Sequence, residues 1–528
     1  MKKSSLVAAA LLAAACSPKI AFEDIAIVPA PVSITAAEGY AKVDGSISAP
    51  EGELSEVAAT FVADASKDGT LDYALVCGQD GSIVLALDET LAPEEYTVAV
   101  AEKVTVTGGS PAGVWWGLQT VRQIAVQAGK WFPCLTVEDA PAFAYRALHL
   151  DCCRHFFDVE QVKRFVDVLS VGKFNTFHWH LTEDQGWRAE IKKYPALTEV
   201  GAVRAQTLVG HHGSTEYDGI EYGGFYTQDQ MREVVEYAAA RGITVIPEVE
   251  MPGHALAALA AYPELGCTGG PYAVEGNWGV FPDIFCVGKD ATMQFLKDVL
   301  DEICEIFPSE YIHIGGDEAP RDRWIECPDC QKRIKDEGLA SEAELQSWLV
   351  REIESYLASK GRRIIGWDEI LEGGVTPSAT VMSWRGAEGG KAAAAQGNDA
   401  IMCPGGYCYL DWYQTADPEA NGEPLSIGGH DNLEMTYSFN PFEGLDEASA
   451  AHILGCQGNN WSEYTPDMDQ LLFKAYPRAT AIAEIDWNPA GKTAYPEFVE
   501  RVRKAVLPLF EANGWQYADY AFRNPAVE

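Results

Sequence analysis

The spacing of apolar positions changes near residue 140. Before that point, residues 20–140 combine runs that alternate apolar and polar residues, such as 97–109, with a segment that repeats at helical spacing. Alternation at every second position is typical of strands, and a repeat of 3.6 positions is typical of helices. The helical segment places Val114, Leu118 and Val121 on one face. We therefore predict a small N-terminal α+β domain over residues 20–140.

From about residue 141, short apolar runs alternate with amphipathic helical segments. Parallel strands joined by right-handed helical crossovers produce this alternation. Eight such runs can be counted, at 146–152, 176–183, 244–250, 311–318, 363–369, 380–386, 400–406 and 453–461. Eight units predict an α/β fold, a closed (β/α)₈ TIM barrel over residues 141–528 that includes a C-terminal helix.

Helix-start signals support the barrel prediction. Asp158 precedes one apolar stripe, and Thr227 with Gln230 precedes another as a capping box. The segment between the fifth and sixth runs is too short for a complete helix, so we expect the barrel to be irregular there. An open doubly wound sheet is the competing fold, but it would carry a glycine-rich phosphate loop after its first strand. Residues 148–156 (LHLDCCRHF) contain no glycine.

The first residues have the features of an export signal. Two lysines precede an apolar stretch over residues 6–15, and small residues lead to Cys16. This order is typical of a secretory signal peptide. The ending resembles a bacterial lipoprotein box, which implies removal of residues 1–15 and lipidation of Cys16. An ordinary signal peptide is the alternative, because Ala13 stands where the box usually has leucine. We expect an exported protein, anchored by lipid to the periplasmic side or surface of a bacterial membrane.

Composition excludes several classes of function. The chain has 39 Lys and Arg against 78 Asp and Glu, a formal charge of −39. A surface this negative repels phosphate backbones, so we expect no nucleic-acid partner. After the leader, no apolar run reaches the roughly 20 residues of a membrane helix, so we expect membrane contact only through the lipid anchor. The chain carries no signal for an oligomeric state.

The thirteen cysteines leave twelve after Cys16. Export would permit disulfides, and Cys267 and Cys286 bracket one loop. Cys327 and Cys330 form a single Cys-x-x-Cys motif. A zinc site would need a second pair at suitable spacing, and none follows. We therefore expect a local disulfide or free thiols at this motif, and no metal.

Polar and aromatic residues follow nearly every predicted strand, where TIM barrels place their active sites. His178 and His180 lie within a strand, and we expect them to form structural hydrogen bonds. Aromatic faces can stack on sugar rings, while carboxylates and arginine bind ring hydroxyls. The strand ends therefore predict a carbohydrate pocket that needs no cofactor. They carry Arg154, Glu183, Asp184, Glu250, His254, Asp317, Glu318, Trp367, Trp384, Tyr409, Asp411, Trp461 and Glu463.

The best candidates for catalysis are two adjacent carboxylates, Asp317 and Glu318, in HIGGDE at 313–318. Neighbours in a strand point to opposite faces, so these two can share a pocket only where the strand bends into a loop. Gly315 and Gly316 allow that distortion. Adjacent carboxylates cannot easily act as acid and nucleophile on opposite faces of a sugar. They can cooperate if the substrate supplies the nucleophile, as a 2-acetamido group would.

Longer motifs resemble glycoside hydrolase family 20, the β-N-acetylhexosaminidases. The resemblance covers the chain after the leader, and it implies a retaining exo-hydrolase that works through an oxazoline intermediate. Its substrates would be glycans ending in β-linked N-acetylglucosamine or N-acetylgalactosamine. The motifs are WGLQTVRQI (116–124), LDCCRHF (150–156), HWHLTEDQGWR (178–188), VIPEVEMPGH (245–254), HIGGDE (313–318), GWDE (366–369), YLDWY (409–413) and GNNWSEY (458–464).

The resemblance assigns catalytic roles residue by residue. Glu318 would be the general acid and base, and Asp317 would hold and polarise the acetamide nitrogen. Tyr409 would donate a hydrogen bond to the acetamide oxygen. His254 would lie behind Glu318 with support from Glu183. We expect Glu318 to be protonated and Asp317 ionised near neutral pH, because two like charges push each other's pKa apart.

The remaining assigned residues would bind the sugar. Ring hydroxyls would meet Arg154, Asp411 and Glu463, and the pocket walls would be Trp367, Trp384 and Trp461. The chain departs from the family at Glu183-Asp184, where Asp-Asp is usual, and at Glu250, where Asp is common. Two alternatives stay open: a lacto-N-biosidase-like enzyme that releases a disaccharide, and a non-catalytic surface lipoprotein that binds glycans.

Overall fold

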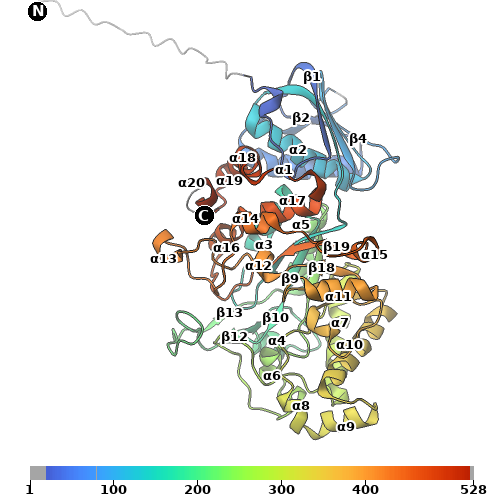
Figure 1. The fold of residues 1–528 in the computed structure, drawn as a ribbon, viewed down its shortest axis with the longest axis vertical. Helices are drawn as coiled ribbons and strands as arrows, with labels where there is room; N and C mark the ends of the chain where they lie inside the picture. The colour runs from blue at the N-terminus through green and yellow to red at the C-terminus, as the bar shows by residue number, and fades with distance from the viewer. Residues whose placement is uncertain (1–18, 79, 524–528) are drawn as a thin grey trace, which may run out of the picture.

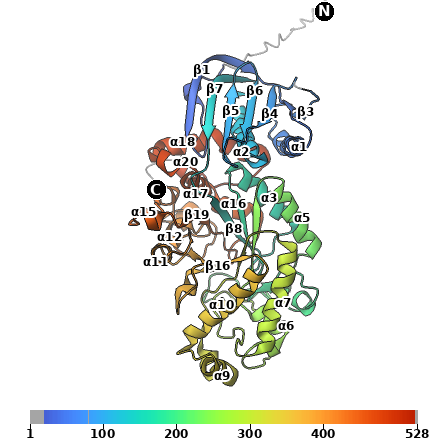
Figure 2. The same ribbon diagram turned by 90° about the vertical axis from the view of Figure 1, so that its right-hand side faces the viewer.

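The computed structural model describes residues 19–78 and 80–523. A sheet domain comes first, a barrel follows, and the last helices return to the sheet domain (Figures 1 and 2). The predicted signal peptide and Cys16 lie outside the described residues. Within the described ranges, no helix has the length and apolar character that a membrane-spanning helix needs.

The N-terminal domain is a mixed seven-stranded sheet in the order β1-β7-β5-β6-β4-β2-β3, with two helices packed beside it. The predicted run 97–109 forms the antiparallel pair β5 and β6. Val114, Leu118 and Val121 are fully buried in the second helix, and the predicted α+β domain is confirmed. The elements are β1 (Ser33–Lys42), β2 (Ser46–Ser48), α1 (Glu53–Ala65), β3 (Ala74–Leu75), β4 (Ile83–Leu87), β5 (Tyr96–Val100), β6 (Val104–Gly108), α2 (Pro111–Ala128) and β7 (Trp131–Asp139).

The second part is a closed barrel of eight parallel strands. Each strand overlaps one of the eight predicted runs, so the TIM barrel is confirmed and the open sheet is excluded. Barrel closure brings the carboxyl ends of all eight strands to one rim. The strands are β8 (Tyr145–Asp151), β9 (Thr176–His180), β14 (Thr244–Glu248), β15 (Tyr311–His313), β16 (Arg363–Trp367), β17 (Thr380–Ser383), β18 (Ala400–Met402) and β19 (Ile453–Gly458).

Helices cover the outside of the barrel and begin where the sequence predicts. Asp158 and Thr227 each form a complete capping box. Between β16 and β17 there is only the 3-10 turn η4 (Asp368–Leu371), which is the expected irregularity. The covering helices are α3 (Val159–Val171), α5 (Gln228–Ala239), α7 (Asp290–Ile306), α10 (Glu342–Ser359), α11 (Glu388–Gln396) and α17 (Arg478–Trp487).

Long loops follow several strands and contain short elements, many of them at the end of the barrel far from the sheet domain (Figure 1). Because these loops leave the carboxyl ends of the strands, they can surround a site at that rim. The short elements are β10 (Thr182–Glu183), β11 (Gly186–Trp187), α4 (Ala196–Glu199), β12 (Val203–Arg204), β13 (Tyr222–Gly223), α6 (Leu256–Ala261), α8 (Asp322–Glu326), α9 (Pro328–Asp336), α12 (Gly405–Cys408), α13 (Pro418–Asn421), α14 (Leu433–Ser438) and α15 (Glu447–Ala450).

A buried carboxylate joins the sheet domain to the barrel. Asp139, the last residue of β7, accepts a hydrogen bond from Trp487 Nε1 at 2.8 Å, and its Oδ2 lies 3.3 Å from Lys173 Nζ. The Tyr96 hydroxyl also donates to it. Among the C-terminal helices, α18 (Tyr495–Ala505) and α19 (Leu507–Asn513) contact α2 of the sheet domain, and Arg501 donates to the Ile27 carbonyl oxygen at 3.0 Å. The other two are α16 (Met468–Ala475) and α20 (Tyr520–Arg523).

Candidate active site

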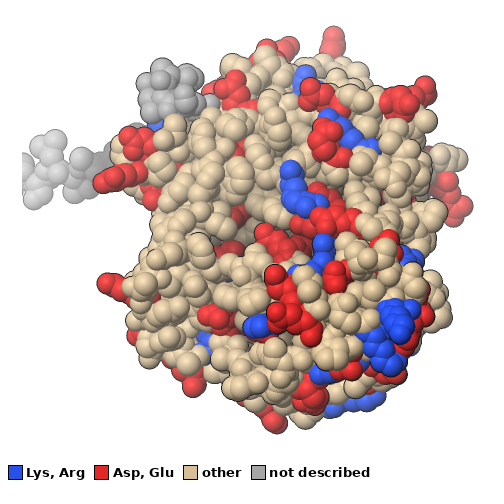
Figure 3. Space-filling view, turned by 60° about the horizontal axis from the view of Figure 1, so that its bottom comes forward, with Lys and Arg blue, Asp and Glu red and all other residues tan. Residues whose placement is uncertain are grey.

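A cavity of about 120 Å³ lies at the carboxyl ends of the barrel strands. At this end of the molecule, acidic side chains gather in and around a central hollow (Figure 3). Nine of the ten lining residues are predicted site residues, and the tenth is Ile427. The lining residues are Arg154, His254, Asp317, Glu318, Trp367, Trp384, Tyr409, Ile427, Trp461 and Glu463.

Of the residues given individual roles at the site, Glu183 and Asp411 do not line the cavity directly. Glu183 is buried behind it, with Oε2 2.9 Å from Arg154 Nη2. Asp411 is buried near Glu463, whose charge acts on it. Both are therefore positioned to act on the residues that line the cavity.

The backbone after β15 explains how Asp317 and Glu318 share one pocket. Gly315 and Gly316 take φ values of 63° and 102°, and Glu318 takes 45°. These left-handed values turn the strand before consecutive side chains can alternate between faces. A Cβ at Gly315 would also lie 1.7 Å from Glu250 Oε2, so a larger residue does not fit. The predicted glycine distortion is therefore present, and both carboxylates enter the cavity.

His254 connects the two carboxylates to an acidic pair behind them. Its Nε2 lies 3.7 Å from both Asp317 Oδ2 and Glu318 Oε2. Its Nδ1 lies 2.7 Å from Glu183 Oε1 and 3.1 Å from Asp184 Oδ2. Burial favours a neutral ring, but the charge of Glu183 and these contacts raise the pKa of His254 well above its usual range. The site therefore places an imidazolium beside the two candidate catalytic groups.

Asp317 differs from the sequence-based expectation in its charge. Burial raises the pKa of Asp317 to about 7; Glu318 adds to the rise, and His254 opposes it. The side chain of Asp317 is 11% exposed, whereas that of Glu318 is 39% exposed. At that pKa a substantial fraction of Asp317 keeps its proton near neutral pH, which differs from the expectation that it is ionised there. Burial, which the sequence does not display, is the main cause of this rise.

Arg154 is fixed by three acceptors. Its Nη1 donates to Asp151 Oδ2 at 3.2 Å, its Nη2 lies 2.9 Å from Glu183 Oε2, and its Nε donates to Gln185 Oε1 at 3.1 Å. The guanidinium carbon also lies 5.0 Å from the centre of the Trp461 ring. Asp151 and Gln185 were not assigned roles from the sequence, although both lie inside quoted motifs. The sequence signal for Asp151 was its position three residues before Arg154, whereas Gln185 lies 31 residues away and only the fold brings it to Arg154.

Aromatic rings form the walls and the floor of the cavity that Asp317 and Glu318 line. The Trp367 and Trp461 rings lie 5.8 Å apart, and the Trp384 and Tyr409 rings are nearly parallel at 6.1 Å. Trp384 Nε1 donates to Glu369 Oε2 at 3.0 Å. Burial raises the pKa of Glu369 to about 8, and Asp317 adds to the rise. Sequence reasoning missed Glu369, for which the motif GWDE was the only signal.

Below the floor, histidines surround one buried glutamate. Trp367 Nε1 donates to Glu248 Oε1 at 2.8 Å. His178 Nε2 and His180 Nδ1 lie 3.1 and 2.5 Å from Glu248 Oε2. The predicted hydrogen-bonding role of His178 and His180 is confirmed. This cluster holds the aromatic floor in place from inside the barrel.

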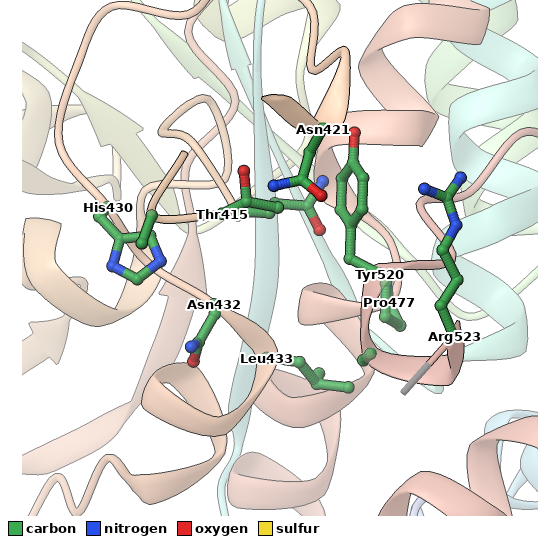
Figure 4. Close-up of a pocket in the computed structure, with 11 residues that line it drawn as sticks. Thr415, Asn421, His430, Asn432, Leu433, Pro477, Tyr520 and Arg523 are labelled. Atoms are coloured by element: carbon green, nitrogen blue, oxygen red, sulfur yellow. The ribbon is translucent and has the colours of Figure 1, made fainter. Parts of the chain in front are cut away.

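A second cavity lies on another part of the surface, between the loop before α14 and helix α20 (Figure 4). At about 160 Å³ it is larger than the first. Its described lining includes Asn421, His430, Tyr520 and Arg523, but no carboxylate and no predicted site residue. Size therefore does not identify the active site here; the convergence of acids and aromatic rings does.

Comparisons with known proteins agree on one family. The catalytic domain of glycosyl hydrolase family 20 matches residues 143–490, and domain 2 of that family matches residues 24–140. A β-hexosaminidase of Porphyromonas gingivalis is 44% identical over 92% of this chain, which spans 63% of that protein's length. A β-hexosaminidase of Akkermansia muciniphila is 35% identical over 80% of this chain and 85% of its own length.

Solved structures give the same result. The β-N-acetylhexosaminidase of Bacteroides fragilis superposes with a TM-score of 0.79 at 33% identity, over 93% of this chain and 97% of that one. The Streptomyces plicatus N-acetyl-β-hexosaminidase in complex with Thio-NAglucal superposes with a TM-score of 0.80 at 30% identity. That comparison covers 95% of this chain and 97% of the other.

Proposed function

The chain belongs to glycoside hydrolase family 20, and we propose that it is an exo-acting β-N-acetylhexosaminidase. It removes terminal, non-reducing β-linked N-acetylglucosamine or N-acetylgalactosamine from glycans, with retention of anomeric configuration. The substrate's own acetamide is the nucleophile. The observation that carries this proposal is a buried acceptor, Asp317 Oδ1, which has no hydrogen-bond partner among the described residues and lies beside Glu318 in an aromatic pocket.

An unpartnered buried oxygen is costly unless a ligand satisfies it. The N–H of a 2-acetamido group is a donor of suitable size, and its methyl group can lie against Trp367, Trp384 and Trp461. Donation of that N–H to Asp317 favours the ionised carboxylate. The proton of the pair then resides on Glu318, where the first chemical step needs it.

In the first chemical step, the acetamide oxygen attacks the anomeric carbon and the glycosidic bond breaks. Glu318 gives its proton to the departing oxygen. Asp317 accepts the N–H hydrogen bond and stabilises the developing positive charge, while Tyr409 donates to the acetamide oxygen. The products are a bicyclic oxazolinium ion, whose N–H stays hydrogen-bonded to Asp317, and a free aglycone. Tethering the nucleophile to the substrate can be worth about 7–11 kcal/mol.

In the second step, water attacks the anomeric carbon from the face that the aglycone left. The Glu318 carboxylate takes a proton from this water, and the acetamide re-forms as the ring opens. Two inversions give net retention. His254, held by Glu183 and Asp184, supplies a nearby positive charge that stabilises the pair whenever both carboxyls are ionised.

The ring hydroxyls of the sugar bind to residues other than the catalytic pair. Arg154 offers donors at the rim, and Glu463 offers acceptors. Both oxygens of Asp411 are buried without a hydrogen-bond partner among the described residues. Burial raises the pKa of Asp411 to about 8, and Glu463 adds to the rise. A ring hydroxyl that donates to Asp411 would satisfy one of these oxygens.

The test compares an aryl β-N-acetylglucosaminide with the matching β-glucoside. Hydrolysis of the first alone is expected, because the glucoside lacks the nucleophile. Comparable rates on both would contradict the mechanism. Analysis of products from defined glycans separates the alternatives: a disaccharide as the first product indicates a lacto-N-biosidase-like enzyme, and binding without turnover indicates a glycan-binding lipoprotein.

We also propose that the protein is lipid-anchored to a bacterial membrane through Cys16. The support is the order of lysines, apolar stretch and small residues before that cysteine. Expression with an alkyne-tagged fatty acid should label the wild type but not Cys16→Ser. Equal labelling of both proteins, or a mature wild type that retains residues 1–15, would contradict the anchor.

A further inference from the structure

Four cysteine sulfurs meet outside the active site, in the loops at the far end of the barrel. Their sulfurs all lie within 4.8 Å of one another. Cys286 Sγ lies 3.5 Å from Cys327 Sγ and 3.6 Å from Cys330 Sγ, and Cys267 Sγ lies 3.8 Å from Cys330 Sγ. Three of the four are buried and Cys267 is partly exposed. None of the twelve described cysteines is in a disulfide.

The spacing of these sulfurs fits a tetrahedral metal centre. A zinc–sulfur bond of about 2.3 Å places tetrahedral sulfurs roughly 3.8 Å apart, while a disulfide needs about 2.05 Å. We propose that Cys267, Cys286, Cys327 and Cys330 bind one Zn²⁺ ion as a structural site. Four thiolate ligands leave no open position for water, so the site has no catalytic role.

The chain presents the ligands from two packed loops. Cys327 and Cys330 open helix α9, whose N-terminus favours thiolates. Residues next to the other two cysteines form a bridge, in which Cys286 N donates to the Leu265 carbonyl oxygen at 2.8 Å. Gly288 lies directly on the Cys-x-x-Cys turn, because a Cβ there would be 2.3 Å from Cys330 N. The two loops are therefore held face to face.

Nearby cations suit the charge of such a centre. Zinc with four thiolates carries a net charge of −2, which needs compensation in a partly buried place. Lys289 Nζ donates to the carbonyl oxygens of Glu264 and Gly266 at 2.9 and 2.7 Å, beside Cys267. Arg333, on α9, donates to the Gly288 carbonyl oxygen at 3.5 Å. Both cations also fix the turns that carry the ligands.

The sequence-based expectation of no metal considered only one arrangement of cysteines. It required a second closely spaced pair after Cys330, whereas the partners precede the motif and are separated from each other by a long loop. Two cysteines far apart in sequence become a pair only when the Gly266–Phe285 bridge closes that loop. Of the two states expected for the Cys327-x-x-Cys330 motif, a local disulfide or free thiols, the structure has free thiols.

The site has a consequence for the active site, because it joins the loops after β14 and β15. Phe285 N donates to the carbonyl oxygen of Pro252, two residues before His254, at 2.9 Å. Trp324 Nε1 donates to the Phe285 carbonyl oxygen at 2.9 Å, and Trp324 lies between Glu318 and Cys327 in the chain. Zinc would thus fix the loops that carry the catalytic residues without touching the substrate.

The first measurement is the metal content of the full-length protein, purified without chelator and analysed by plasma mass spectrometry. About one zinc per chain is expected, with a lower melting temperature after treatment with 1,10-phenanthroline and recovery on addition of ZnCl₂. Cys330→Ser and Cys286→Ser should each lose the zinc. Cys304→Ser, which changes a partly buried cysteine on α7 outside the cluster, should keep it.

The intact mass of the denatured protein distinguishes free thiols from disulfides in the cluster. Two disulfides within the cluster would make the denatured protein about 4 Da lighter than the thiol form. That mass, or the absence of bound zinc both after purification and after incubation of the reduced protein with ZnCl₂, would overturn the proposal. Because metal content and mass do not depend on turnover, their outcome is independent of the proposed glycosidase activity.

Discussion

Buried carboxylates serve two different purposes in this molecule. At the junction between the domains, Asp139 meets Lys173, Trp487 and Tyr96, so its charge and hydrogen bonds are satisfied. Asp317 lines the pocket with one oxygen that has no partner among the described residues, and Asp411, buried near the lining residue Glu463, has two such oxygens. Unsatisfied buried acceptors cost stability. The difference indicates that the junction is built for folding and the pocket is built for a ligand.

Removal of the general acid Glu318 should reduce activity more than any of the other substitutions below. Glu318→Gln should reduce kcat roughly 10²–10⁴-fold on substrates with poor leaving groups, because no proton can be delivered. The loss should be much smaller for a dinitrophenyl leaving group, which departs without a proton. Glu326→Gln, an exposed neighbour on α8, is the matched control. Equal losses on both leaving groups would contradict the role of Glu318 as general acid.

Asp317→Asn tests the second carboxyl of the catalytic pair, which is proposed to bind the acetamide. Activity should fall roughly 10²–10³-fold, because the charge that stabilises the acetamide in the transition state is gone. Thermal stability should stay equal or rise, since an unpartnered buried carboxylate is removed. Calorimetry together with steady-state kinetics provides both readouts. A large loss of stability would show that Asp317 is a structural residue.

Asp139→Asn should give the opposite result at the junction. Lys173 would be left buried without its partner, and the free energy of unfolding should fall by about 3–5 kcal/mol. The folded fraction should keep its kcat, because the junction does not contact the pocket. Glu138→Gln, on the exposed side of the same strand, is the control. Urea denaturation measures the change, and an unchanged midpoint would remove the distinction between the two regions.

The pH dependence of kcat/KM should report the proton that the two carboxyls of the pocket share, with a smaller effect than the substitutions. The pair formed by Asp317 and Glu318 must keep one proton for catalysis. Burial raises the pKa of Asp317 to about 7, so the last proton leaves the pair as pH rises through that value. We expect kcat/KM to fall about tenfold per pH unit above it. A profile that stays level to pH 9 would contradict a shared proton.

Much of the fold followed from local patterns in the sequence. The eight strands, the capping boxes at Asp158 and Thr227, and the glycine distortion before Asp317 each depend on neighbouring residues. The proton on Asp317 and the meeting of four cysteines did not follow, because both depend on segments that only the closed barrel brings together. Ile427 enters the pocket from a long irregular loop for the same reason. Motifs therefore identified the site residues better than they identified their charges.

In the proposed mechanism, the acetamide of the substrate attacks the anomeric carbon while Asp317 orients it. The most direct measurement is kcat/KM for aryl glycosides whose acetyl group carries zero, one, two or three fluorines. Fluorine withdraws electrons from the carbonyl oxygen and weakens it as a nucleophile. We predict a steep, continuous fall in kcat/KM with each fluorine in the wild type. A series that is flat within error would show that the acetamide takes no part in bond formation.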